Sequence, residues 1–168
     1  METADLAALS SDQLQALSAS AVAALSTAQV ASLTTAQVSK LTANQIKSLS
    51  GTQVAALTEA QVGELTTAQV SVLSATQVKA METADVAKLS TAQIQAVSAS
   101  AVAAMSTAQV KALTTTQAEK LTAGQVASLS ATQVAGLETE DLAKFSSSQL
   151  QALNATTVAA LSTAQVAA

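Results

Sequence analysis

Residues 25–40 read LSTAQVASLTTAQVSK, which is one eight-residue pattern written twice: a leucine, a hydroxyl residue, a glutamine three residues later, and then a valine. The octad runs without insertion or deletion over all 168 residues, so the chain consists of 21 units. Counted from Met1, position one is Leu in 16 octads, position two is Ser or Thr in 17, and position five is Gln in 15. Position six is Val, Leu or Ile in every octad except the one that contains Ala118. Such a repeat predicts one structural unit per octad.

These four positions match the parts of one helix-start motif. In the octad that begins at Leu25, Ser26 can serve as the N-cap, and Gln29 can reach back to the Ser26 N–H to complete a capping box. Leu25 and Val30 then occupy the two positions of a hydrophobic staple. An N-cap residue has non-helical dihedral angles, so a helix that begins in every octad must also end in every octad. The motif therefore predicts 21 short helices.

The motif assigns structural roles to residues along the whole chain. The candidate cap residues that we single out are Ser26, Gln29, Thr34, Gln37, Ser50 and Gln53. The candidate core residues are Leu25, Val30, Leu33, Val38, Leu49, Val54, Leu73 and Val78. We expect Gln69→Ala to cost little stability, whereas Val70→Asp should disrupt a neighbourhood of several octads.

Other folds fit the period of eight less well. In one continuous helix, eight residues turn about 80° past two full turns, so the leucines would spiral around the helix and form no face. Strands would need an alternation with period two, which is absent. Disorder would not require Leu and Val to stay in register over 21 units. The sequence therefore favours an all-α solenoid, a superhelix of 21 capped helices in a single domain over residues 1–168. We expect several octads per turn, such as three or four, although the sequence does not fix this number.

Composition argues against most functional classes. The chain has no His, Cys, Tyr, Trp or Arg, which rules out His-based catalytic triads and Cys/His zinc sites, and we expect no enzyme activity, cofactor or metal. Its seven Lys are scattered and its net charge is −4, so no basic stripe for nucleic acid is present. Ser, Thr or Gln interrupts every apolar stretch, which argues against insertion into a membrane. The start, METAD, is acidic, unlike a secretory signal peptide.

One block of sequence recurs on a longer scale. METAD at residues 1–5 returns at 81–85, and LETED stands at 137–141, each followed two octads later by SASAV or NATTV. These segments indicate block duplications. The Glu–Asp pairs could be read as a recurring ligand site, but Asp also suits the positive end of a helix N-terminus, and we interpret it as a variant cap.

The run from Leu25 to Val38 resembles octapeptide tandem tracts of very large bacterial proteins, many of them adhesin-like or secreted. The resemblance covers the whole chain and implies an extended spacer or stalk at the cell surface. The alternative is a binding scaffold, natural or designed, for a protein or peptide, which should carry a patch that departs from the consensus. The mild departures are Phe145, Lys144 and Ala118. Rows of Ser and Thr also leave ice or surface binding as a minor alternative.

Both ends of the chain fall on an octad boundary, which is typical of an excised or engineered segment. Neither end has a polar capping repeat of the kind that solenoids use to stay soluble. The last octad, LSTAQVAA, follows the consensus at every position. We therefore expect end-to-end self-association.

Overall fold

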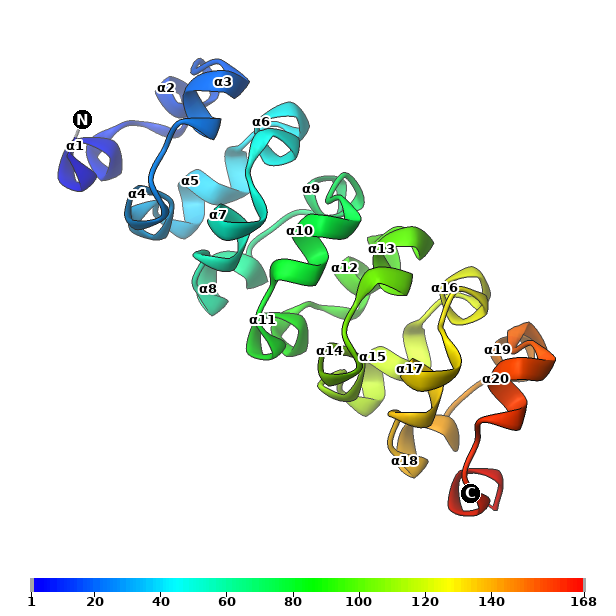
Figure 1. Cartoon of the computed structure of the whole chain (residues 1–168). Coiled ribbons are helices and arrows are strands. Elements are labelled where there is room, and N and C mark those ends of the chain that lie inside the picture. Colours follow the sequence, from blue (N-terminus) through cyan, green and yellow to red (C-terminus); the bar gives the residue numbers. More distant parts are fainter. Residues whose placement is uncertain (1, 168) are drawn as a thin grey trace.

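The computed structural model describes residues 2–167, and within that range it contains short α-helices and no strand, which confirms the predicted all-α solenoid (Figure 1). Each helix has four to six residues, one helix per octad. In chain order they are α1 Thr3–Ala8, α2 Ser11–Gln15, α3 Ala19–Ala23, α4 Thr27–Ser32, α5 Thr35–Lys40, α6 Ala43–Ser48, α7 Gly51–Ala55, α8 Glu59–Gly63, α9 Thr67–Ser71, α10 Ala75–Ala80, α11 Thr83–Lys88, α12 Thr91–Ala96, α13 Ala99–Ala104, α14 Thr107–Lys111, α15 Thr115–Lys120, α16 Ala123–Ala127, α17 Ala131–Ala135, α18 Thr139–Leu142, α19 Ser147–Ala152, α20 Ala155–Ala159 and α21 Thr163–Val166.

Each helix has its N-cap in position two and begins at position three. Ser26, the N-cap of α4, has extended dihedral angles (φ −72°, ψ 161°), and its hydroxyl accepts a hydrogen bond from the Gln29 N–H at 3.2 Å. The Gln29 side-chain oxygen accepts in turn from the Ser26 N–H at 2.7 Å. Two of the N–H groups that lack partners within a helix are thereby satisfied, as a capping box requires.

Each helix ends about one and a half turns later, without help from glycine. Where α4 ends, the Leu33 N–H donates to the Val30 carbonyl at 3.2 Å, and Leu33 itself is extended (φ −59°, ψ 141°). No described residue has a positive φ. Where a helix runs to position eight, as α4 does, two consecutive extended residues, in positions one and two, separate it from the next helix. Where it ends at position seven, as α7 does, an αR residue in position eight follows it.

The helices wind around a common axis and form a rod whose two ends carry the two termini (Figure 1). Each helix packs against the helix three octads before it and the helix three octads after it. Small side chains allow this close approach: a Cβ built on Gly51 of α7 would lie 3.1 Å from the Ala80 Cβ of α10. Helices this short are not stable alone, so contacts between successive turns must hold them.

The core is one continuous column of residues from positions one and six. Val30, Val38 and Val70 are fully buried, and Leu33 and Leu73 are 4% exposed. All buried apolar side chains from Leu6 to Phe145 belong to a single cluster. Because the column is only a few side chains wide, Leu and Val fill it without aromatic residues, apart from Phe145.

Candidate functional site

The side chains that join one turn to the next are the glutamines in position five. From Gln37 onward every position-five Gln is buried, although the capping role alone would leave this side chain at the surface. We call these residues the glutamine ladder: Gln37, Gln45, Gln53, Gln61, Gln69, Gln77, Gln93, Gln109, Gln117, Gln125, Gln133, Gln149 and Gln165.

The Gln69 side chain shows the geometry of the ladder. Its oxygen accepts from the Thr66 N–H at 2.7 Å and so caps its own helix, α9. Its Nε2 donates to the Val38 carbonyl at 2.8 Å and to the Leu41 carbonyl at 2.7 Å, at the end of α5. These carbonyls have no partner four residues ahead, because α5 stops there. One amide group therefore satisfies the start of one helix and the end of the helix four octads before it.

The same two bonds recur at every rung of the ladder. Each Gln Nε2 donates to the carbonyls 31 and 28 residues earlier in the chain. Helix packing links octads three apart, while the ladder links octads four apart. One superhelical turn therefore takes between three and four octads.

Sequence reasoning gave Gln only its capping role, and the structure adds two bonds to carbonyls of the preceding turn. We therefore expect Gln69→Ala to cost more stability than the loss of a cap alone. The signal was present in the sequence. A capping box accepts Glu as readily as Gln, yet no octad has Glu in position five. A carboxylate could accept from the N-cap N–H but could not donate to carbonyls, whereas an amide does both.

The ladder has gaps at four octads in the interior of the rod. Position five is Asp85 in α11, Ala101 in α13, Asp141 in α18 and Thr157 in α20. None of these side chains donates to the turn before it: the Thr157 hydroxyl donates instead to the Asn154 carbonyl of its own octad, at 2.8 Å. The recurring METAD-type blocks therefore coincide with octads that lack the two bonds of a rung.

The two buried aspartates lie in an unfavourable electrostatic environment. Burial raises the pKa of Asp85; the hydrogen bond from the Glu82 backbone lowers it in part, and the Glu82 and Glu59 carboxylates raise it. Burial also raises the pKa of Asp141; hydrogen bonds with the Thr115 side chain and the Glu138 backbone lower it in part, and the Glu138 and Glu140 carboxylates raise it. Asp85 Oδ2 accepts from the Glu82 N–H at 3.1 Å, as a variant cap should. Asp141 Oδ2 is buried and has no hydrogen-bond partner among the described residues.

The structure places the singled-out cap residues at helix starts. Ser26, Thr34 and Ser50 are N-caps, and their hydroxyls accept from Gln29, Gln37 and Gln53 respectively. The singled-out core residues Val30, Leu33, Val38, Leu49, Val54, Leu73 and Val78 are at most 5% exposed. Leu25 differs, since it is only half-buried. It lies in the first turn, and no described turn covers its N-terminal side.

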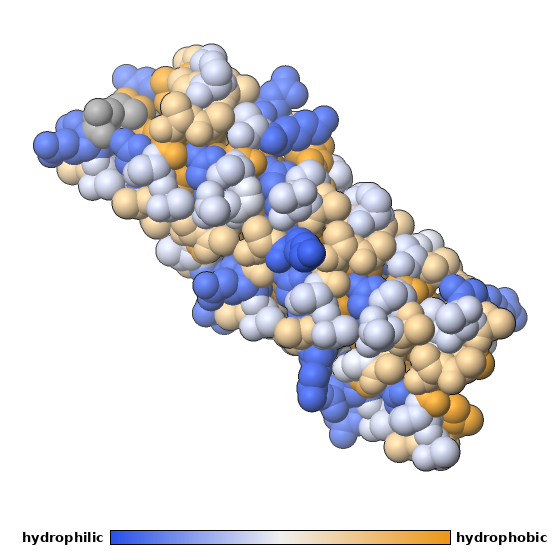
Figure 2. Space-filling view, in the orientation of Figure 1, coloured by the Kyte–Doolittle hydropathy of each residue, from blue (hydrophilic) through white to orange (hydrophobic). Residues whose placement is uncertain are grey.

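The outer surface of the rod carries scattered charged side chains and no distinct patch, and we call it plain in this sense. All seven Lys lie in positions seven and eight and are exposed. Strongly hydrophilic residues are scattered along the face in Figure 2 and form no continuous patch. Lys88 pairs with Glu59, and Lys111 pairs with Glu138, each at 3.4 Å.

In the described part of the chain, no group of His, Cys, Asp or Glu is arranged to hold a metal ion, and no helix has the length and apolar character needed to cross a bilayer.

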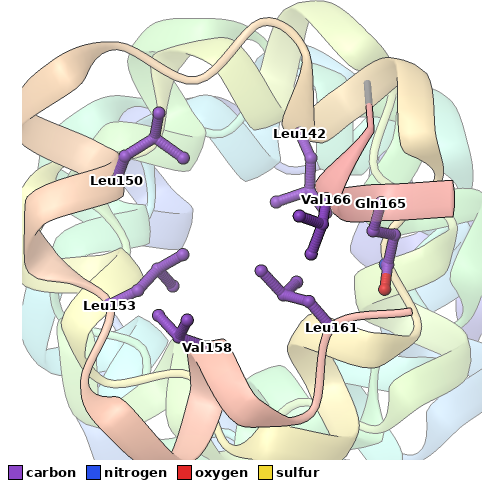
Figure 3. Close-up of a pocket in the computed structure, with 7 residues that line it drawn as sticks. All are labelled: Leu142, Leu150, Leu153, Val158, Leu161, Gln165 and Val166. Atoms are coloured by element: carbon purple, nitrogen blue, oxygen red, sulfur yellow. The ribbon is translucent and has the colours of Figure 1, made fainter. Parts of the chain in front are cut away.

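A pocket of about 340 Å³ opens at the C-terminal end of the rod. Figure 3 shows the lining side chains pointing into a central opening surrounded by the ribbon. The lining is apolar except for one glutamine, and consists of Leu142, Leu150, Leu153, Val158, Leu161, Gln165 and Val166. Leu150 is 48% exposed, Val158 47% and Val166 70%, although position six is almost fully buried elsewhere in the rod. We call this surface the C-terminal cup.

Comparison with known proteins identifies the repeat. The family model described as the ALTTAQ repeat matches residues 1–35, 32–67, 78–115, 102–131 and 134–168. No curated protein and no solved structure matches the chain. The repeat that the model matches is the one built here from capped octads. Because the matches together cover most of its length, the chain belongs to the ALTTAQ repeat family.

Proposed function

We propose that this repeat protein is a non-catalytic, rod-like spacer or stalk within a larger bacterial protein that is secreted or displayed at the cell surface. The observation that carries the proposal is the glutamine ladder. Each rung joins an octad to the octad four before it, by the same two bonds every time. A rod assembled from identical links grows in length with each added octad and needs no other contact.

The plain outer surface supports a spacer over a binding scaffold. A scaffold needs a surface patch that departs from the consensus. Of the three departures in the sequence, Phe145 is only 7% exposed and Ala118 is fully buried. Lys144 alone is exposed. The departures therefore lie mainly inside the column, where they cannot meet a partner.

The N-cap hydroxyls also argue against a surface that orders ice. At each Ser or Thr N-cap the hydroxyl already accepts from a backbone N–H, as Ser50 does from Gln53 at 3.2 Å. Such a hydroxyl is held in the orientation that capping requires, and not in one set by a water lattice. The absence of ice-recrystallisation inhibition is the expected result for this chain.

The experiment that tests the spacer role varies the number of octads. Two chains would be compared with the original in small-angle X-ray scattering: one that lacks residues 41–72, and one in which the same four octads are duplicated. The maximum dimension should fall and rise by equal amounts, with an unchanged cross-section. When each chain links an epitope to a surface, the distance of the epitope from that surface, its reach, should be shortest for the deleted chain and longest for the chain with duplicated octads.

Surface substitutions supply the control. Replacing Lys79, Lys111 and Lys120 by Ala changes the outer face but touches neither the ladder nor the column. A spacer should keep its reach with these changes. If reach were independent of octad number, or if display were lost when the three Lys were replaced, the spacer role would be wrong.

A further inference from the structure

We propose that the C-terminal cup binds the N-terminal turn of a second copy of this chain, so that copies stack head to tail and continue one superhelix. The inference concerns an interaction surface and does not depend on the spacer role. It rests on the different residues left uncovered at the two ends, on an internal copy of the N-terminal block, and on the register of the glutamine ladder.

The two ends of the rod differ in position six. At the C-terminal end it is uncovered: Leu150, Val158 and Val166 are about half or more exposed. At the N-terminal end it is fully buried, at Leu6, Leu14 and Val22. Position six of one turn is therefore covered by the turn that follows it. Position one is only half-buried at both ends, at Leu9 and Leu17 and again at Leu153 and Leu161, and it is buried between them.

The chain already contains the proposed interface once. Residues 81–104 differ from residues 1–24 at six of 24 positions. This internal copy, α11 to α13, packs on α8 to α10, and its position-one residues Met81, Leu89 and Val97 are at most 5% exposed. The N-terminal block is thus a sequence that stacks on a preceding turn when one is available. The C-terminal cup offers such a turn.

The ladder fixes the register of the second copy. In the internal block, Gln93 Nε2 donates to the Val62 carbonyl at 3.1 Å and to the Leu65 carbonyl at 2.6 Å. The equivalent residue at the N-terminus is Gln13, which is exposed and whose side-chain oxygen caps α2. If residue 1 of the second copy follows residue 168 of the first, the same spacing brings Gln13 Nε2 to the Leu150 and Leu153 carbonyls.

Charge does not oppose the contact. The last three octads, residues 145–168, contain no charged side chain. The first three octads carry Glu2, Asp5 and Asp12 and no Lys. Asp5 corresponds to Asp85, which is buried in the internal copy while α11 keeps its capping box, so one stacked turn of this chain already accommodates an aspartate in this position. Stacking of unlike surfaces leaves one free end on each side, so it continues into filaments.

Two blocked variants test both the contact and its polarity. The tail variant is Val158→Asp with Val166→Asp, at two exposed side chains of the cup. The head variant is Gln13→Glu with Leu17→Asp, at the N-terminal turn. Each variant alone should sediment as a monomer, because it lacks one half of the contact. An equimolar mixture should form a 1:1 dimer and nothing larger, since only one free tail and one free head remain.

The unaltered chain should form species that grow with concentration in sedimentation velocity. Circular dichroism checks that both variants keep their helices, and Gln13→Glu alone replaces the head variant if Leu17→Asp unfolds the first turn. Its self-association should then be weakened tenfold or more. Three results would overturn the proposal: an original chain that stays monomeric at every soluble concentration, a head variant that still forms dimers, which indicates tail-to-tail contact, or a mixture that contains no dimer.

Discussion

The octads from Leu33 to Ala80 and those from Met81 to Ala104 fold alike but are joined differently to the turns before them. In the first region every position-five residue is a glutamine of the ladder. In the second, only Gln93 is a rung, while Asp85 and Ala101 leave gaps. The apolar column is equally buried in both regions. The fold therefore persists where rungs are missing, and we infer that the ladder adds to the strength with which successive turns are attached.

The largest expected effect is on the column itself. Val70→Asp places a carboxylate at a fully buried position in a region where every turn has its rung. An unpaired buried charge should lower the free energy of unfolding by about 4 kcal/mol or more. Val166→Asp makes the same change in the same octad position at a side chain that is 70% exposed, and should leave stability nearly unchanged. Equal melting temperatures for the two variants would refute the assignment of the column.

The next largest effect is the loss of stability when one glutamine of the ladder is removed. Gln69→Ala removes the bonds from Gln69 to the Leu41 carbonyl and the Thr66 N–H and leaves the Val38 carbonyl with only the Leu41 N–H, which should cost about 2–3 kcal/mol. Gln13→Ala removes only an exposed capping bond, because no described turn lies before α2, and should cost about 0.5–1 kcal/mol. Urea denaturation of both variants measures the difference. If the two costs were equal, the ladder would add nothing to capping.

Adding a glutamine at a gap in the ladder should raise the stability of the fold, whereas the two preceding substitutions lower it. In Ala101→Gln, the ladder spacing directs the new Nε2 to the Val70 and Leu73 carbonyls, at the end of α9. We expect stabilisation by about 1 kcal/mol, the net contribution of a typical hydrogen-bonded group. Thermal unfolding followed by circular dichroism would show it. A destabilised variant would mean that the volume occupied by a rung is not free at this gap.

The smallest effect is the dependence on pH that the aspartate gaps create. Burial raises the pKa of Asp85 and of Asp141 above the ordinary value of 3.8. The unfolded chain therefore ionises at lower pH than the folded chain, so the contribution of these groups to stability is complete below pH 3.8 and is lost as pH rises through the folded pKa.

Melting temperatures between pH 3 and pH 7 test this dependence. Asp85→Gln with Asp141→Gln should reduce the decline of stability with pH and also add two rungs. Asp12→Asn, at an exposed side chain of α2, is the control and should leave the decline as it was. A decline that is unchanged in the double variant would show that other carboxyl groups cause it.

The fold could be predicted from the sequence because its determinants are local. Leu25, Ser26, Gln29 and Val30 lie within six residues and together specify where a helix begins, so the period of eight leads directly to one helix per octad. The number of octads per turn depends on how Ala and Ser side chains let neighbouring helices approach, as Gly51 and Ala80 do, and no short segment encodes that distance.

The ladder was missed because its acceptors are backbone carbonyls. The partners of Gln69 lie 28 and 31 residues away. Every residue type carries the same backbone carbonyl, so the acceptor leaves no mark in the sequence. A pattern of side chains therefore cannot reveal the pairing. Only the preference for an amide over a carboxylate in position five points to it. The gaps at Asp85 and Asp141 were visible in the sequence but could not be understood as gaps before the ladder was known.

The joint between helices, in which no described residue has a positive φ, has a consequence for how such a chain changes over generations. Any octad can be followed by any other, because the joint makes no demand on a particular neighbour. Gain or loss of whole octads by slippage or recombination of the coding DNA would rotate everything downstream about the axis but would leave every contact of the same kind. The echoes of METAD at distances of 80 and 56 residues, both whole numbers of octads, have the form that such events leave behind.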